Sequence, residues 1–421
     1  MNNIIIKASR NTDSVAKCSL STQTVAFSHY NHLSGQLAVD PQTKAVVAGD
    51  ISAQTTQCLD NIKAIVESIG HVMDDVVKIT IFLKDITDIA AVDAVYATFF
   101  QSYLPTRTVL AVAALPMDKA LIQIDAVISN GEGTQPQAPC DLAKVTNNTD
   151  NAPKTSVSTQ TVAFSHYNNI SAQLPIDPKT GSLVSGDVKQ QTAQCLKNIK
   201  AILQSIDVPI DDIVKVNIFL TDLTNTDAVN EVYSTFFPDS AIARTVGYWP
   251  ARTVSAATAL PMQALVQIDA VVSHGDGTPP QEVEDRHGIV IKANNTTNAP
   301  KSSVATQTVA FSHYNNISAQ LPISAESGKM ITGDVTAQAT QCLENIKAIL
   351  QSIDHVMDDV VKVNIQLKNI TDIDAVNDIY TPFFNSDLPA RTVIGVSAIP
   401  MDALIQIDAV VSNAEGTPPA L

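Results

Sequence analysis

Three arginines stand out because Lys and Arg together number only 26 in this chain, and each of the three opens a β-branched run. They are Arg107 in "LPTRTV", Arg252 in "WPARTV" and Arg391 in "LPARTV". A proline just upstream stiffens the approach to each one. A guanidinium held in this way can clamp a carboxylate through two parallel hydrogen bonds. The pattern indicates a binding site for a small organic acid, and a surface ion pair is the alternative role.

Three carboxylates form a second candidate set, because "QIDAV" repeats with Asp125, Asp269 and Asp408 at its fourth position. Side chains alternate between the two faces of a strand, so Gln123 shares the face of Asp125. The opposite face, which suits a core, carries Ile122, Ile124, Ala126 and Ile128. A carboxylate can position a water molecule and shuttle its proton. A solvated strand face is the competing interpretation.

A third candidate set lies in a repeated segment with small residues, which reads "LSGQL" in one copy and "ISAQL" in the other two. Its serines are Ser34, Ser171 and Ser318. Small residues in a strand let a ligand or another backbone come close, although a packing bulge gives the same pattern. A serine there can donate a hydrogen bond to a ligand.

Histidines His29, His166 and His313 recur within "FSHYN" and have the chemistry of general bases. Their place at the tip of a predicted hairpin favours a role in the turn or at an interface. The sequence has no CxxC or CxxH spacing, so we expect no metal site. It also lacks a phosphate loop and a nucleotide fingerprint.

All these residues recur because the chain repeats one passage three times. "TQTVAFSHYN" begins at Thr22, Thr159 and Thr306, and "NIKAI" and "QIDAV" follow in each copy. A period of roughly 140 residues is the size of a domain, not of a solenoid repeat. Polar connectors rich in Gly and Pro separate the copies. We expect three domains, at residues 1–131, 138–275 and 286–421.

Composition excludes several classes of protein. The 421 residues are 45% hydrophobic and 16% charged, which is typical of globular chains. The net charge of −16 disfavours nucleic-acid binding, which needs clustered cations. No apolar run approaches the ~20 residues of a membrane helix, and no secretory signal opens the chain, so we expect a cytoplasmic protein.

Within one copy, helical and strand patterns alternate. The first copy predicts a hairpin, a helix, a strand, a second helix and two strands, at residues 22–40, 49–70, 75–85, 87–100, 107–116 and 121–129. Asp50 is placed to cap the first helix. The order β-β-α-β-α-β-β predicts an α+β fold with both helices on one face of the sheet.

Six segments in this order resemble the RidA/YjgF family of reactive enamine/imine deaminases, also described as endoribonuclease L-PSP. They are "SGQLAVDPQT", "QCLDNIKAIVESIG", "DDVVKITIFLKDITD", "VYATFF", "LPTRTV" and "IQIDAV". The resemblance covers nearly all of each copy. It implies a chorismate-mutase-like α+β fold that forms trimers with ligand clefts between subunits. Three fused copies then imply an intramolecular pseudo-trimer, formed by a single chain.

The resemblance also implies roles for particular residues. The family's carboxylate-binding arginine falls on the three arginines named above, its water-positioning glutamate on the three aspartates, and its serine on the three serines. Its asparagine on the second helix matches Asn230 and Asn377, whereas the first copy has Asp93. Where the family often carries a tyrosine, this chain has Ser21, Ser158 and Ala305. The middle copy offers a second "ART" with Arg244.

The implied reaction is hydrolysis of 2-imino or 2-enamino acids to 2-keto acids and ammonia, as in a 2-iminobutanoate/2-iminopropanoate deaminase, without a metal or organic cofactor. The expected partner is a small carboxylate, with neither nucleic acid nor membrane. One alternative is a non-catalytic binder of small carboxylates or a scaffold. A ribonuclease is a third possibility, which the acidic charge disfavours.

Overall fold

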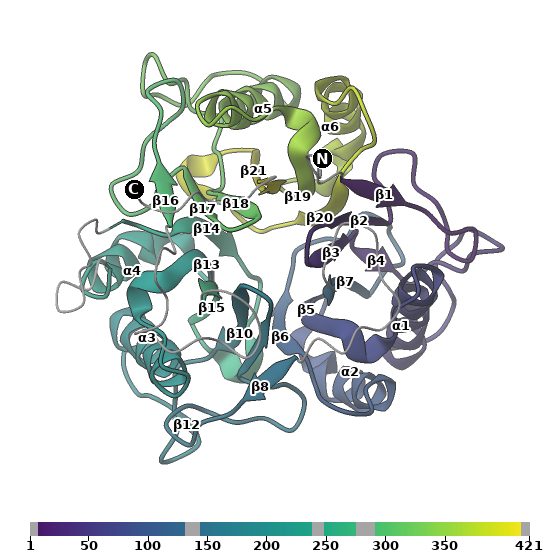
Figure 1. Ribbon diagram of the computed structural model, residues 1–421, viewed down its shortest axis with the longest axis vertical. Coiled ribbons are helices and arrows are strands. Elements are labelled where there is room, and N and C mark those ends of the chain that lie inside the picture. Colours follow the sequence, from purple (N-terminus) through teal and green to yellow (C-terminus); the bar gives the residue numbers. More distant parts are fainter. Residues whose placement is uncertain (1–6, 131–143, 238–247, 275–290, 414–421) are drawn as a thin grey trace, which may run out of the picture.

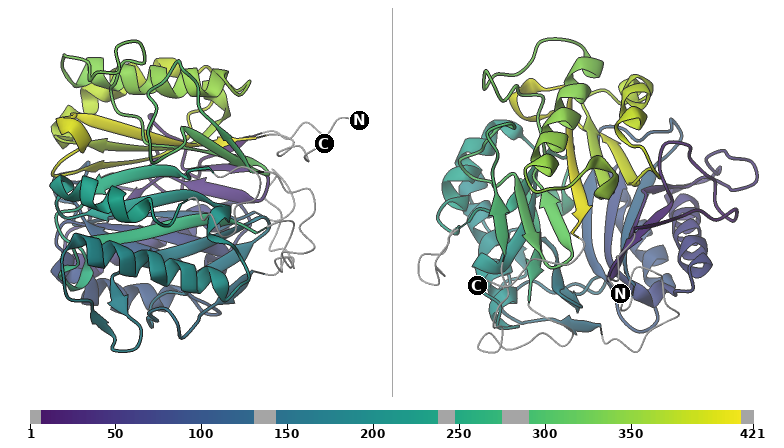
Figure 2. Two further views of the ribbon diagram at one scale, coloured as in Figure 1. Left: turned by 90° about the vertical axis from the view of Figure 1, so that its left-hand side faces the viewer. Right: turned by 45° about the horizontal axis from the view of Figure 1, so that its top comes forward.

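Three similar α+β units form a ring in the computed structural model, which describes residues 7–130, 144–237, 248–274 and 291–413 (Figure 1). The sheets face the centre of the ring and the long helices lie outside them (Figure 2). The predicted fold of three tandem α+β repeats is confirmed. The boundaries expected near residues 131–138 and 275–286 lie outside the described residues.

The units share one order of elements. Repeat 1 contains β1 (Ala8–Arg10), β2 (Thr24–Phe27), β3 (Tyr30–Leu33), β4 (Gln36–Leu37), α1 (Ile51–Ser68), β5 (Val76–Leu83), α2 (Ile89–Tyr96), β6 (Thr106–Ala111) and β7 (Ile122–Ser129). Repeat 2 contains β8 (Val145–Asn147), β9 (Thr161–Phe164), β10 (Tyr167–Gln173), β11 (Ile176–Asp177), β12 (Ser182–Leu183), α3 (Val188–Gln204), β13 (Ile213–Leu220), α4 (Thr226–Tyr233), β14 (Ala251–Ala256) and β15 (Val266–Ser273). Repeat 3 contains β16 (Lys292–Asn294), β17 (Thr308–Phe311), β18 (Tyr314–Ile317), α5 (Val335–Gln351), β19 (Val360–Leu367), α6 (Ile373–Tyr380), β20 (Ala390–Gly395) and β21 (Ile405–Ser412).

The first helix of each repeat forms for reasons that are visible in the sequence. The carboxylate of Asp50 accepts a hydrogen bond from the Ala53 N–H at 3.0 Å, which satisfies one of the unpaired donors at the start of α1. Asp187 and Asp334 cap α3 and α5 in the same way. Apolar residues at helical spacing then pack on the sheet, among them the buried Leu59 and Ile62.

The sheet of repeat 1 has the strand order β1-β2-β3-β7-β5-β6, with β5 and β6 parallel and the other pairs antiparallel. The predicted hairpin is confirmed, because Phe27 pairs with Tyr30 across a two-residue turn of Ser28 and His29. The predicted faces of the last strand are confirmed too. Its isoleucines and Ala126 join the core under the helices.

Apolar side chains also cover the inner faces of the sheets, where the repeats meet. One cluster joins the starts of the central strands and includes Val77 and the three equivalent tyrosines of the hairpins, Tyr30, Tyr167 and Tyr314. A second cluster joins their ends and includes Phe82 and Phe219. A polar chamber of about 190 Å³ lies between the two clusters. The ring is therefore packed about its axis and is not held by its connectors alone.

Candidate functional site

The three predicted arginines occupy equivalent buried positions on β6, β14 and β20. Arg107, Arg252 and Arg391 are only 6%, 5% and 7% exposed. Each guanidinium lies over the ring of the tyrosine that ends the second helix, 4.8, 4.6 and 5.0 Å from the ring centroid. This cation–π contact holds the charge in place without using its hydrogen-bond donors. The guanidinium groups are therefore not surface groups, although that of Arg107 forms an ion pair with a partly exposed carboxylate.

The three predicted serines lie at the seams between repeats, beside these arginines. Each serine Oγ accepts a hydrogen bond from the arginine backbone N–H of the neighbouring repeat: Arg107 to Ser171 at 2.9 Å, Arg252 to Ser318 at 2.8 Å and Arg391 to Ser34 at 2.8 Å. Each hydroxyl donates its hydrogen to a threonine carbonyl of its own repeat. These contacts fix the arginine strand against the next repeat. Substrate binding by the serines stays a prediction.

Two of the seams open into clefts that contain an arginine. The first cleft, of about 670 Å³, lies between repeats 1 and 2 and is lined by Arg107, Asp93 and Gln267. The second cleft, of about 330 Å³, lies between repeats 2 and 3 and is lined by Arg252 and Gln406, with Asn230 beside them. Both clefts are large enough for a small organic acid.

The clefts differ in the partner of the arginine. In the first cleft, the Arg107 Nη2 forms an ion pair with the Asp93 carboxylate at 2.5 Å. In the second cleft, Asn230 replaces the aspartate, and both its Oδ1 and the Arg252 Nε and Nη2 are buried without a hydrogen-bond partner among the residues that the structure describes. Burial lowers the pKa of Arg252 from its usual value, although a guanidinium remains charged at neutral pH.

The third seam resembles the second. Asn377 takes the place of Asn230, and within the described part of the chain its Oδ1 and the Arg391 Nη1 are also buried without a hydrogen-bond partner. Burial lowers the pKa of Arg391, which shows that its charge is largely removed from water. A buried cation with unused donors favours an anionic ligand, because the ligand restores the hydrogen bonds that water would otherwise supply.

The three predicted aspartates do not share these clefts, which corrects the sequence-based assignment. They line the central chamber instead. Asp269 accepts hydrogen bonds from Thr108 of repeat 1 at 2.7 Å and from Asn217 at 2.7 Å, and the Nζ of Lys78 lies 3.5 Å away. The equivalent bonds from threonine to aspartate at the other seams are Thr253 to Asp408 at 2.8 Å and Thr392 to Asp125 at 2.9 Å.

The chamber therefore holds three ion pairs between neighbouring repeats. The Lys362 Nζ lies 3.3 Å from Asp125, and the Lys215 Nζ lies 4.0 Å from Asp408. Burial lowers the pKa of both lysines, which the carboxylates oppose. These bonds join neighbouring repeats outside the two clefts, and water positioning by the aspartates stays a prediction.

Sequence reasoning missed the glutamines of "QIDAV" as residues of the clefts. Gln267 and Asp269 share one face of β15 but lie about 7 Å apart along the strand. Only the glutamine reaches the first cleft, and Gln406 does the same in the second cleft. The signal was present as a polar residue on an inward face of the last strand.

Other predicted positions are placed as follows. Ser158 and Ala305, which stand where the related family often has tyrosine, line the first and second clefts. Ser21 is partly buried in repeat 1. Arg244 lies outside the described residues, so the arginine that the structure places in the second cleft is Arg252. Of the helices in the described ranges, none combines the length and apolar character that crossing a bilayer requires.

Comparison with known protein families gives one match, which occurs three times along the chain. The family is described as endoribonuclease L-PSP, and the matches span residues 15–129, 150–274 and 296–413. The three matched segments contain the arginines, serines and second-helix residues described above.

Individual relatives match one repeat at a time. A "RutC family protein" of Pyrococcus horikoshii is 42% identical over 106 residues, which are 25% of this chain and 83% of the relative. A "2-iminobutanoate/2-iminopropanoate deaminase" of Salmonella typhimurium is 48% identical over 97 residues, which are 22% of this chain and 74% of the relative. Among solved structures, a Rid family protein of Yersinia pestis is 38% identical, with a TM-score of 0.29, and the match covers 31% of this chain and 99% of that one.

Proposed function

Because the chain belongs to the endoribonuclease L-PSP family, we propose that it hydrolyses reactive 2-imino or 2-enamino acids to 2-keto acids and ammonia. The similarity to proteins named 2-iminobutanoate/2-iminopropanoate deaminase supports this reaction class. The observation that carries the proposal is the buried Arg252, whose Nε and Nη2 have no hydrogen-bond partner in the described ranges and lie beside a cleft that fits a small acid.

Binding begins with the carboxylate of the substrate. The guanidinium of Arg252 or Arg391 clamps it through paired hydrogen bonds, which are strong because the site is shielded from water. The tyrosine ring behind each guanidinium fixes the direction of the clamp. This contact orients the C=N carbon of the substrate toward the rest of the cleft and limits its rotation.

Hydrolysis then needs one positioned water molecule. A 2-enamino acid first tautomerises to the 2-imino acid. The hydroxyl of water adds to the C=N carbon and the first proton of water goes to the nitrogen; the hydroxyl proton then moves to the nitrogen as the C–N bond breaks, which gives the keto acid and ammonia. In the second cleft the side chain of Gln406 is one of the polar groups that line the site, and we assign it the role of orienting this water. Its Nε2 donates to the Val254 carbonyl at 2.8 Å and to the Gln366 Oε1 at 2.7 Å, which holds the amide rigidly.

A test uses ammonia release from freshly generated 2-aminoacrylate, measured above the uncatalysed rate. We expect Arg252→Ala combined with Arg391→Ala to lower the enzymatic rate at least about tenfold, because both open clamps are lost. Arg107→Ala is the matched control, since that guanidinium is already paired with Asp93. If the alanine double variant fails to fold, Arg252→Lys with Arg391→Lys takes its place in the test, because lysine keeps the positive charge but cannot form the paired hydrogen bonds of a guanidinium. A wild-type rate in a folded double variant would reject the proposal.

A second candidate is a non-catalytic binder of small carboxylates. It is favoured by the lining of the second cleft, where the described residues include no aspartate or glutamate that could act as a base. Saturable binding of 2-ketobutyrate by calorimetry, without any release of ammonia from 2-aminoacrylate, would identify this function instead.

A further inference from the structure

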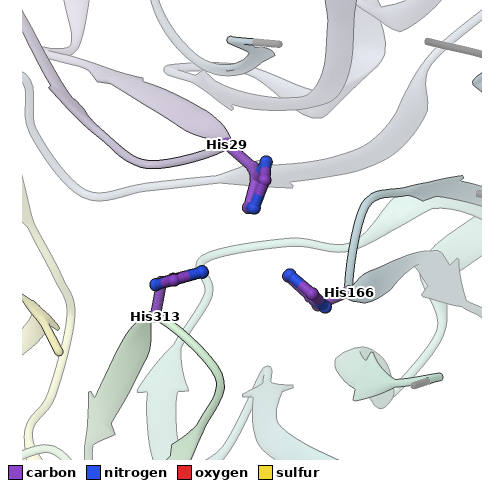
Figure 3. Close-up of side chains that lie close together, drawn as sticks. All are labelled: His29, His166 and His313. Atoms are coloured by element: carbon purple, nitrogen blue, oxygen red, sulfur yellow. The ribbon is translucent and has the colours of Figure 1, made fainter. Parts of the chain in front are cut away.

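The histidines of the three hairpins meet at one point on the axis of the ring. The ring centroids of His29, His166 and His313 lie 4.9, 5.2 and 5.5 Å apart. One nitrogen from each imidazole lies within 4.8 Å of the other two. Figure 3 shows the three side chains pointing toward a common centre from three separate hairpins. We propose that these imidazoles bind one divalent first-row transition metal ion, with Zn²⁺ as the best fit.

The distances suit a metal after a small movement. A point equidistant from three atoms that lie within 4.8 Å of one another is at most about 2.8 Å from each, and zinc–imidazole bonds are about 2.0–2.1 Å. Each imidazole must therefore move inward by less than roughly 1 Å, which a side-chain rotation can supply. Three neutral imidazoles favour zinc, nickel or copper over magnesium or calcium, which prefer oxygen ligands. A water molecule would complete the tetrahedron.

The hairpin turns hold the histidines rigidly in this place. The backbone N–H of Asn130 donates to the His29 carbonyl at 2.7 Å, and its side chain donates to the Ser28 carbonyl at 2.9 Å. At the other two turns, His274 and Asn413 make the same pair of contacts. One residue at the end of the last strand thus clamps each turn, as supporting hydrogen bonds do at metal sites.

The backbone of the turns is a second sign of a specialised site. Ser28, Ser165 and Ser312 have φ values of 48°, 53° and 48°, a left-handed region that favours glycine or asparagine in such turns. A serine there costs on the order of 1 kcal/mol in each copy. The ten residues of "TQTVAFSHYN" are nevertheless identical in the three repeats, whereas the residue that follows them differs, as His32 in one copy and asparagine in the others.

The site joins all three repeats through one ion. His29 is buried and the other two histidines are partly exposed. Spacing rules for metal sites could not detect it, because each ligand comes from a different repeat, more than 130 residues along the chain. Binding would stabilise the folded ring, since the ligands converge only when the repeats are assembled.

Calorimetry with Zn²⁺ on tag-free, metal-stripped protein tests the proposal. We expect one Zn²⁺ per chain, a higher melting temperature with Zn²⁺, and loss of both effects in His29→Asn/His166→Asn/His313→Asn. The matched control is His32→Asn, which removes a nearby histidine and restores the residue of the other copies. This control should bind as the wild type does.

Single variants and spectra sharpen the test. His313→Asn alone should weaken Zn²⁺ binding at least about tenfold if the triple variant does not fold. Co²⁺ should give the absorption of a tetrahedral nitrogen site, lost in the same variant. The proposal would be overturned if the wild type bound no Zn²⁺. It would also be overturned if the folded triple variant bound Zn²⁺ as the wild type does, because that result means an adventitious ion only.

Discussion

The first and second clefts are made of equivalent strands and helices, yet among the described residues only the first pairs its arginine with a carboxylate. In the first cleft, the Asp93 carboxylate forms an ion pair with the guanidinium of Arg107. In the second cleft, Asn230 stands in place of the aspartate, and the Arg252 Nε and Nη2 have no hydrogen-bond partner among the described residues. In a trimer of identical subunits, one such substitution would change all three sites together. In a fused chain it changes one site, so binding function and structural function can separate between seams.

The largest expected effect comes from giving the second and third seams an aspartate at the position that Asp93 has in the first cleft. Asn230→Asp with Asn377→Asp places a carboxylate beside each free guanidinium, where it competes with the ligand. We expect 2-ketobutyrate to bind about 10–100-fold more weakly by calorimetry, the equivalent of one charged hydrogen-bond pair. Ser234→Asp adds the same charge at an exposed position just after α4 and should leave the affinity close to wild type. Equal affinity in the double variant would break the comparison.

A smaller effect should separate binding from turnover in the second cleft. In an Arg391→Ala background, Gln406→Leu removes the amide that orients water but leaves the carboxylate clamp. We expect kcat for ammonia release to fall about tenfold with little change in KM. A rise in KM alone would instead place Gln406 in substrate binding.

The reverse substitution should open the first cleft. Asp93→Asn gives Arg107 the surroundings of the other two arginines, so calorimetric stoichiometry for 2-ketobutyrate should rise from two to three per chain. Loss of the partly buried ion pair should also lower the free energy of unfolding by about 1 kcal/mol. The matched change Asp150→Asn removes a carboxylate at the rim of the same cleft and should alter neither quantity. A stoichiometry of three in the wild type would contradict this account.

The smallest effect concerns a difference between repeats outside the clefts. His355 in repeat 3 forms a partly exposed ion pair with Asp359 at 3.0 Å, which raises the pKa of the histidine. This stabilisation is present below the unfolded pKa of about 6.5 and is lost as the pH rises through the higher folded value. We expect about 0.5 kcal/mol at most, because solvent screens the pair. Urea unfolding of the two proteins should show that His355→Gln loses more stability relative to wild type at about pH 5.5 than at about pH 8.5.

The equivalent pair in repeat 1, His71 and Asp75, should contribute to the loss of folding stability at acidic pH. Burial alone would raise the pKa of Asp75, but hydrogen bonds from His71, Lys144 and the Val72 N–H lower it to about 2. That stabilisation is present above the unfolded pKa of about 3.9 and is lost as the pH falls through about 2. Lys144 belongs to repeat 2, so this pair also links two repeats.

Much of the fold could be predicted from one repeat. The capping aspartate, the apolar stripe of α1 and the alternation in β7 each depend on local periodicity, and all were confirmed. The arginines could be singled out because a cation before a β-branched run is rare in so acidic a chain. The burial of these arginines against a tyrosine ring could not be predicted from a local pattern, because the tyrosine belongs to the second helix and not to the arginine strand.

The assignment of the aspartates failed for a different reason. Gln123 and Asp125 share a face, but the packing of three sheets around an axis decides which of them meets an arginine and which meets a lysine. A strand pattern contains no information about the neighbouring repeat. The histidines were predicted at a turn or interface, and they do lie at the turns and contact one another, although their convergence could be seen only in the assembled ring.

The tyrosines of the hairpins pass hydrogen bonds around the ring without a break: Tyr30 donates to the Phe164 carbonyl, Tyr167 to that of Phe311 and Tyr314 to that of Phe27. The junction between the last repeat and the first therefore has the same contacts as the two junctions that a connector spans. A circularly permuted chain that begins with the middle repeat should therefore fold into the same ring with a similar melting temperature, because these contacts hold each junction whichever repeat comes first in the chain.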